Sequence, residues 1–127
     1  MNYLDLDDLR AVGAAALDAP MEVRDWGLLE SALARPQASA FGEDAYASIW
    51  EKAAALLLSL VGNHALVDGN KRVGFTCTVL FLYKNGVALQ FEEDEAYDFV
   101  IAVAERRILD VADAAAVLSA WAVPGGQ

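Results

Sequence analysis

The stretch of residues 70–84, NKRVGFTCTVLFLYK, most restricts what this chain can fold into. From Val73 to Tyr83 it is apolar almost without interruption, and it stops at Asn85-Gly86, a pair typical of helix ends. It is well short of the roughly 20 apolar residues that cross a bilayer. A helix that is apolar nearly all round needs neighbours on every side, so we predict a central buried helix here.

Cap residues and apolar spacing predict further helices around it. Asp5 would cap a helix over residues 6–17, a second would run from about 25 to 35 before Pro36, and a third from 44 to 61. A fifth would begin near residue 92, and a sixth would follow Asp110. The expected inward face of the fifth is Tyr97, Val100, Ile101, Ala104 and Ile108, and that of the sixth is Val111, Ala114, Ala115, Leu118 and Trp121.

The connections between these segments are short. Residues 36–44, PQASAFGED, have no period and predict an exposed loop or short hairpin, and residues 87–91 predict a brief extended segment. At 127 residues the chain is large enough for one core. We therefore expect an all-α fold: a single domain over 1–127, a compact bundle of about six helices around the central one, with a frayed tail from about 122.

Composition excludes several classes of function. The formal net charge is −10, with nine cations against nineteen carboxylates, which is the wrong balance for direct nucleic-acid binding. A single cysteine, Cys77, excludes an intramolecular disulfide, and one His with one Cys cannot build a zinc site. The acidic N-terminus does not resemble a signal peptide, and no apolar run is long enough for a membrane span. A soluble cytoplasmic protein is the expectation.

Polar residues concentrate in residues 64–72, HALVDGNKR, between the third predicted helix and the central one. The first turn of a helix presents unpaired backbone N–H groups and the positive end of the helix dipole. Gly69 would let the oxygens of a ligand approach that backbone closely, and Asn70, Lys71 and Arg72 would add donors around the same point. This pattern predicts a phosphate cradle, although the chain contains neither GxxxxGK[ST] nor GxGxxG.

Two residues beside the predicted phosphate cradle are candidates for a metal ligand and a general base. Asp68 is placed to hold Mg²⁺ against the phosphates, because this ion typically uses one or two carboxylates together with substrate oxygens. His64, the only histidine, is the one side chain here that titrates near neutral pH, so it is the candidate general base for an attacking hydroxyl. Base, metal ligand and anion cradle together predict phosphoryl or nucleotidyl transfer.

Each residue of this set also has a purely structural explanation. His64 can stabilise the last carbonyls of the preceding helix, and Asp68 or Asn70 can be an ordinary N-cap. Lys71 and Arg72 can be a solvated pair. Cations are disfavoured at the positive end of a helix, however, so two of them side by side favour a bound anion.

The motif resembles the signature of the Doc (death-on-curing) branch of the Fic/Doc superfamily, HxFx[D/N][G/A]NKR, with Leu66 in the phenylalanine position. The segments GLLESALARPQ (27–37), EKAAALL (51–57) and LFLYKNG (80–86) resemble the surrounding text of the family. The resemblance implies an all-α fold. It also implies that residues 38–44 correspond to the flap that positions the target segment, supported by Arg35.

The branch matters because Fic-type AMP-transferases have a second glycine where this chain has Lys71. Doc-like proteins with NKR resemble kinases, which pass the γ-phosphate of ATP to a threonine of elongation factor Tu. By this resemblance His64 would be the base and Asp68 the Mg²⁺ ligand, while Asn70, Lys71 and Arg72 would bind phosphate with Gly69 in the cradle. Leu66 should preserve burial of the loop anchor.

The resemblance also implies a partner. No [S/T]xxxE[G/N] inhibitory motif occurs in the chain, so restraint would come from a cognate antitoxin, a small protein whose C-terminal helix lies in a groove near the site. We therefore expect a toxin kinase that uses ATP and Mg²⁺ and blocks translation. A Fic-type AMP-transferase and a degenerate, non-enzymatic binding module are the alternatives.

Overall fold

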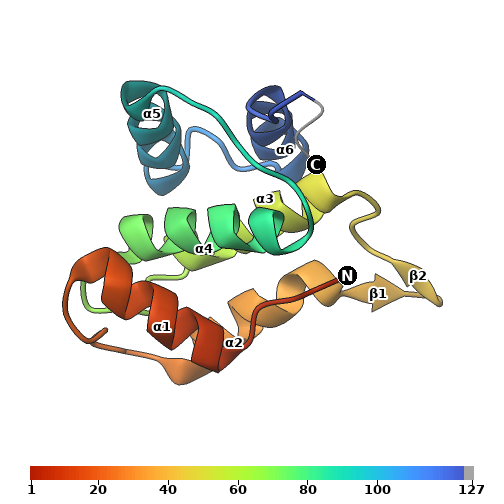
Figure 1. The fold of residues 1–127 in the computed structure, drawn as a ribbon. Coiled ribbons are helices and arrows are strands. Elements are labelled where there is room, and N and C mark those ends of the chain that lie inside the picture. The colour runs from red at the N-terminus through yellow and green to blue at the C-terminus, as the bar shows by residue number, and fades with distance from the viewer. Residues whose placement is uncertain (125–127) are drawn as a thin grey trace.

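The computed structural model describes residues 1–124, and within them the chain forms six helices and one small hairpin (Figure 1). The predicted all-α class is confirmed. The elements in chain order are α1 (Leu6–Leu17), α2 (Trp26–Ala34), the 3-10 turn η1 (Arg35–Gln37), β1 (Ser39–Ala40), β2 (Glu43–Asp44), α3 (Ile49–Gly62), α4 (Asn70–Lys84), α5 (Glu93–Ala104) and α6 (Val111–Ala120).

The helices stack in three layers (Figure 1). α3 and α4 lie side by side in the middle, α1 and α2 cover one side of this pair, and α5 and α6 cover the other. A central buried helix exists as expected, but it is α3 and not the predicted helix over 70–84. α3 contacts α2, η1, α4, α5 and α6, whereas α4 leaves Tyr83 and Lys84 exposed at its end. None of the helices in residues 1–124 combines the length and apolarity that crossing a membrane requires.

Side-chain caps set where the helices begin. Asp5 caps α1 and Asp25 caps α2, each accepting a hydrogen bond from the backbone N–H of the third residue of its helix. The predicted start of α3 at residue 44 is wrong, because Ser48 and Glu51 form a capping box that starts the helix at Ile49. The predicted bounds of α4 are confirmed.

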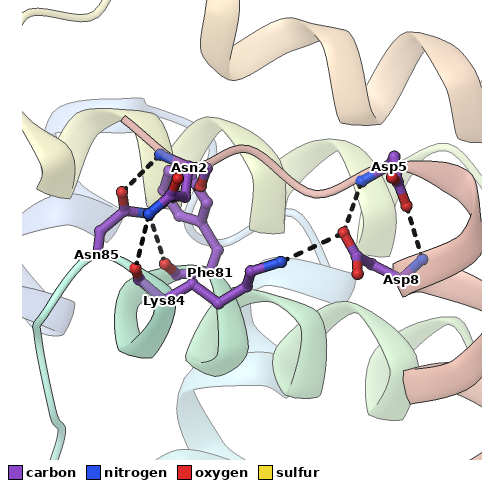
Figure 2. A network of polar contacts seen from close by, with 6 residues as sticks. All are labelled: Asn2, Asp5, Asp8, Phe81, Lys84 and Asn85. Carbon is purple, nitrogen blue, oxygen red and sulfur yellow. Dashed lines mark hydrogen bonds and ion pairs between the residues drawn. The ribbon is translucent and has the colours of Figure 1, made fainter.

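The N-terminal segment is tied to the end of α4 (Figure 2). Asn2 and Asn85 exchange two hydrogen bonds: the Asn2 backbone N–H donates to Asn85 Oδ1 at 2.8 Å, and Asn85 Nδ2 donates to the Asn2 carbonyl at 2.9 Å. Tyr3 stacks on Phe81 with ring centroids 6.0 Å apart. Residues 2 and 3 therefore cover one end of α4 and close the core there.

The segment after α6 forms backbone hydrogen bonds where a frayed tail was predicted. Leu89 and Ala122 form an antiparallel bridge, and the Val123 N–H donates to the Ala88 carbonyl at 3.0 Å. The expectation of a frayed tail from about 122 is therefore wrong for Ala122 and Val123, and the expected extended segment over 87–91 has its partner here. Residues 125–127 of the expected tail lie outside the described residues.

The predicted inward face of α5 is confirmed for Val100 and wrong for Tyr97. Tyr97 is 66 % exposed, and Ile101 and Ala104 are only half-buried. The buried residues of the helix are Ala96, Phe99, Val100, Ala102 and Val103. α5 turns Phe99 towards Trp121 after α6, with ring centroids 5.4 Å apart, and this contact rotates Tyr97 out of the core. The predicted face of α6 is confirmed for Ala114, Ala115, Leu118 and Trp121.

Candidate active site

Residues 63–69 form the loop between α3 and α4, and backbone hydrogen bonds fasten this loop to the segment before α2. The Ala65 carbonyl accepts from the N–H groups of Arg24 and Asp25 at 2.7 and 3.0 Å. The Val67 N–H donates to the Glu22 carbonyl at 2.9 Å, and Val23 and Leu66 form an antiparallel bridge. The loop is therefore held as part of the scaffold and presents its polar residues from a fixed backbone.

Asn70 fixes the inner turn of the loop through both ends of its amide. Its Oδ1 accepts from the Leu66 N–H at 3.0 Å and its Nδ2 donates to the Leu66 carbonyl at 3.0 Å. Leu66 itself is 2 % exposed, so leucine keeps the anchor buried where the family pattern has phenylalanine. These contacts give Asn70 a role in shaping the loop, and its role as a phosphate binder stays a prediction.

Gly69 is the N-cap residue of α4, and no side chain caps this helix. Its φ of 86° lies in the left-handed region that glycine adopts at little cost. A Cβ at this position would lie 2.6 Å from Leu17 Cδ2 of α1, so a larger residue would also press on α1. The backbone N–H groups of the first turn of α4 are thus left open to a ligand, as the predicted cradle requires.

A cleft of about 630 Å³ opens between the first half of α4 and α5. One end is polar and consists of residues of the motif, while the remainder is largely apolar and comes from α1, α4, α5 and the segment before α5. Its lining residues are Leu17, Asp68, Gly69, Lys71, Arg72, Phe75, Thr76, Phe91, Glu93, Ala96, Tyr97, Val100 and Ile101. A cleft with one charged end and a long apolar wall suits a ligand that carries both phosphate and an aromatic or aliphatic group.

The polar end of the cleft has two cations without carboxylate partners. Lys71 and Arg72 are exposed, and neither forms an ion pair with any residue in 1–124. They lie in the first turn of α4, where the dipole is positive and disfavours them. The explanation as a solvated pair agrees with their exposure, but it leaves the unfavourable position unexplained; a bound anion would relieve it.

The carboxylates of this cleft are sparse. Asp68 is exposed, and its Oδ1 accepts from the Gly69 N–H at 2.8 Å. Glu93, at the start of α5, lines the same cleft. In the described residues no three His, Cys, Asp or Glu side chains come together as a metal-binding group. This donor set fits Mg²⁺ held jointly by protein and phosphate oxygens, since that ion needs only one or two carboxylates of the protein.

His64 stands at the other end of the loop, directly after α3. It is exposed, it is not among the residues lining the cleft, and its imidazole makes no hydrogen bond to any residue in 1–124. The explanation that it stabilises the last carbonyls of α3 therefore finds no support. Its φ of 53° lies in the left-handed region, which few non-glycine residues adopt, as it does for Asp18 and Arg106.

The hairpin does not lie beside the motif. Lys52, near the start of α3, holds Asp44 of the hairpin, and the helical rise of about 1.5 Å per residue puts Gly62, the last residue of α3, about 15 Å further along the helix. Figure 1 shows the hairpin and the α3–α4 loop at opposite ends of the central layer. The correspondence of residues 38–44 to the flap that positions the target segment stays a prediction, and Arg35, expected to support it, donates to Tyr46 Oη at 2.9 Å directly after the hairpin.

The residues of α5 that form the second wall of the cleft were not predicted from the sequence. Glu93 and Tyr97 are one helical turn apart on α5 and face the motif, but their spacing suggested a helix start and a core position instead. Cys77 takes no part in the site. It is fully buried in α4, and burial, with a contribution from Asp8, raises the pKa of its thiol to about 12.

Comparisons with known proteins agree with the motif. The Fic/DOC family model matches residues 3–82, a stretch that runs from before α1 almost to the end of α4. The chain is 51 % identical over 106 residues to a curated relative described as "Toxin Doc" from Mycolicibacterium smegmatis (strain ATCC 700084 / mc(2)155). That match covers 82 % of this chain and 82 % of the relative, so it includes the motif loop and the helices that hold it.

Proposed function

This chain belongs to the Fic/DOC family, and we propose that it is the toxin of a toxin–antitoxin pair. In this proposal it is a protein kinase that transfers the γ-phosphate of ATP to a threonine or serine hydroxyl of a translation factor of the elongation factor Tu type. The modification would block translation in the cytoplasm. The name of the relative supports the toxin part, and the residues of the motif support the kinase part.

The observation that carries the choice of phosphoryl transfer is Lys71 at the open start of α4. Lys71 and Arg72 line the polar end of the cleft and lack partners among residues 1–124. An anion with several oxygens would be bound there by the two side chains and by the free N–H groups of the first turn. In the resembling AMP-transferases a glycine takes the place of Lys71 and leaves room for the α- and β-phosphates in the adenylylating pose. A lysine fills that room.

The remaining residues have roles that fit this reaction. His64 would take the proton of the attacking hydroxyl, whose oxygen then bonds to the γ-phosphorus while the bond to the β–γ bridging oxygen breaks and ADP leaves. The exposed position of His64 suits an acceptor that arrives as part of another protein. Asp68 would hold Mg²⁺ together with phosphate oxygens, and the ion would neutralise charge on the transferred group.

A partner follows from the same proposal. A chain that disables an essential factor must be neutralised in its own cell, and we propose a cognate antitoxin whose C-terminal helix lies in the cleft between α4 and α5. The apolar wall of the cleft, which includes Phe75, Phe91 and Ile101, is suited to the apolar face of a helix. Such an occupant would also cover the cations at the polar end.

Labelled ATP separates the three candidate functions. We expect label to pass to a protein in a bacterial lysate from ATP labelled at the γ position and not from ATP labelled at the α position. The opposite result would establish AMP transfer, the second candidate. Label from neither position, with the chain folded and ATP and Mg²⁺ present, would favour the non-enzymatic binding module.

A further inference from the structure

A second groove, of about 650 Å³, lies between α5 and α6, away from the candidate active site. Figure 1 shows these two helices together in one outer layer. Both pack on α3 but scarcely contact each other, so the space between them is left open. The residues that line the groove all come after residue 82, outside the part of the chain that the Fic/DOC family model matches. The groove is therefore a feature separate from the motif.

The groove has an apolar floor and walls of small residues. Two nearly buried aromatic residues, Phe99 of α5 and Trp121 after α6, lie at its floor with ring centroids 5.4 Å apart. Ala102 lines the wall that α5 forms, and Ala116 and Ala120 line the wall that α6 forms. Packed helices approach to about 8–10 Å between axes, depending on the side chains at the contact. Alanines on both walls thus leave room for a third helix to lie close to α5 and α6.

The charged residues of the groove are all acidic. Glu95 and Asp98 lie almost one turn apart on α5, are exposed, and form no ion pair with any residue in 1–124. The next cations along the chain, Arg106 and Arg107, do not line the groove, and Arg107 is paired with Glu105 at 3.0 Å. A surface that covers two unpaired carboxylates favourably has to bring cations to them.

We propose that the groove between α5 and α6 binds a basic amphipathic helix of another protein. Its apolar face would lie on the floor, and two lysine or arginine residues one turn apart would meet Glu95 and Asp98, because residues three or four apart share one face of a helix. A second copy of this chain would bring a net charge of −10 towards the same carboxylates and is disfavoured. The inference goes beyond the proposed function and does not depend on it.

This occupant differs in chemistry from the one proposed for the cleft between α4 and α5. That cleft has Lys71 and Arg72 at its polar end, whereas the groove has carboxylates and no cation among its lining residues. α5 separates the two sites, since Tyr97 lines the cleft and Asp98 lines the groove. Both sites can therefore be occupied at the same time.

A synthetic peptide is the probe. It is a helix of about 15 residues, or four turns, with leucine along one face and lysine beside it. A peptide of the same composition with its leucines scattered, so that no apolar face forms, measures attraction by charge alone. Binding is followed by fluorescence anisotropy of the labelled peptides, with the His64→Ala chain as the protein so that it can be expressed by itself. We expect the ordered peptide to bind about tenfold more tightly than the scattered one, or better.

Two exposed residues of α6 test where the peptide lies. Ala116 lines the groove, whereas Ser119, almost one turn further along the helix, does not. Arginine at either position adds the same charge, but only Ala116→Arg fills the groove and opposes the lysines of the peptide. We expect Ala116→Arg to weaken binding about tenfold or more and Ser119→Arg to stay within about twofold. The unfolding midpoint, measured on both, should change little because both positions are exposed.

Two pairs of acidic residues test the role of charge. Glu95→Gln combined with Asp98→Asn removes the carboxylates of the groove. Asp94→Asn combined with Asp113→Asn removes two exposed carboxylates that do not line it, and the net charge changes equally. We expect the first combination to weaken binding about fivefold or more and to make it less sensitive to salt, and the second to stay within about twofold.

Several outcomes would overturn the inference. They are equal binding of the ordered and scattered peptides, equal binding by the Ala116→Arg and Ser119→Arg chains, or equal binding by the two neutralised chains. A dimer of the peptide-free chain that Ala116→Arg converts to a monomer would assign the groove to a second copy instead. These measurements need neither ATP nor a lysate, so their failure leaves the proposed function standing, and a failure of label transfer leaves the groove standing.

Discussion

His64 is the residue on which the proposed chemistry depends most directly. Replacement of His64 by alanine should abolish γ-label transfer and growth inhibition, since a general base contributes roughly 10²- to 10⁴-fold and no other imidazole exists in the chain. The variant should fold normally, because the imidazole makes no hydrogen bond to residues 1–124 and alanine leaves the α3 packing intact. Transfer rates and circular dichroism measured on the same preparation check both parts. A folded variant that remains as toxic as wild type would show that the mechanism is wrong.

Gly74 shows how a local rule and packing can disagree at one residue. Glycine inside a helix costs about 1 kcal/mol relative to alanine, so Gly74→Ala would stabilise an isolated α4. In the folded chain a Cβ at Gly74 would lie 2.8 Å from Val61 Cγ2 and 3.4 Å from the Val61 backbone nitrogen. The β-branched Val61 side chain cannot turn away freely, so we expect Gly74→Ala to lower the free energy of unfolding by about 1 kcal/mol or more.

Urea denaturation measures this change, and Gly62→Ala is the control. Gly62 is also helical, at the end of α3, and a Cβ there would meet nothing within 4 Å. That variant should be neutral or slightly stabilising. If Gly74→Ala were as stable as Gly62→Ala, the close approach of α3 and α4 at Gly74 would not be the reason for glycine there.

At the scale of elements, the capping box of α1 also ties this helix to α4. Asp8 Oδ2 accepts from the Asp5 N–H at 3.0 Å and from Lys84 Nζ at 3.5 Å (Figure 2). The hydrogen bond from the Asp5 backbone, with a smaller contribution from Lys84, lowers the pKa of Asp8 below its ordinary value of 3.8. A carboxyl whose folded pKa is depressed contributes stability above its unfolded pKa and loses it as the pH falls through the folded value.

We therefore expect Asp8→Asn to cost about 0.5–1 kcal/mol of unfolding free energy at pH 7. The difference from wild type should shrink below about pH 4 and vanish once Asp8 is protonated in the folded state. Asp7→Asn is the matched control, because Asp7 lies in the same first turn but makes no hydrogen bond to the described residues. Chemical denaturation between pH 3 and pH 7 gives the comparison. A difference that persists unchanged at pH 3 would contradict the assigned role.

Which elements could be predicted follows from where their signals lie. Some helix ends could be predicted from the sequence because caps act within one turn of the helix. Examples are Asp5 before α1 and Asn85-Gly86 after α4. The start of α3 was also encoded, in Ser48 and Glu51, but the unpatterned residues before it obscured the box. The buried face of α5 could not be predicted from the sequence. The contact between Phe99 and Trp121 decides it, and these two residues are far apart in the chain.

At the scale of the whole molecule, one half of the candidate site could be predicted from the sequence, and the other half forms only when the chain folds. The motif loop is a continuous stretch, so its histidine, carboxylate and cations could be named from the sequence. The opposite wall of the cleft comes from α5, and Glu93 and Tyr97 line the same cleft as Lys71 and Arg72 only because α4 and α5 pack together. The identity of the central helix escaped prediction for the same reason: α3 is surrounded through contacts between distant elements.

The cleft as a whole leads to the last prediction, which concerns its occupant. Coexpression with the proposed antitoxin, a small protein that we expect to be encoded next to this chain, should yield a stable complex in which the cleft between α4 and α5 is covered. A ligand that binds only the folded chain raises its unfolding temperature by mass action. A neutralised toxin should also express without slowing growth, whereas the chain alone should do so only when His64 is replaced.

The three lysines of the chain allow the covered face to be located in one measurement. Lys71 is exposed and lines the cleft, Lys84 lies at the other end of α4, and Lys52 is buried under the hairpin. Amine labelling followed by mass spectrometry should show Lys71 reactive in the free His64→Ala chain and protected in the complex, with Lys84 unchanged and Lys52 unreactive in both. Equal reactivity of Lys71 in the two samples would place the partner elsewhere. High expression of the wild-type chain alone, without growth inhibition and without a copurifying small protein, would contradict the toxin proposal itself, because an active toxin cannot accumulate unrestrained in a growing cell.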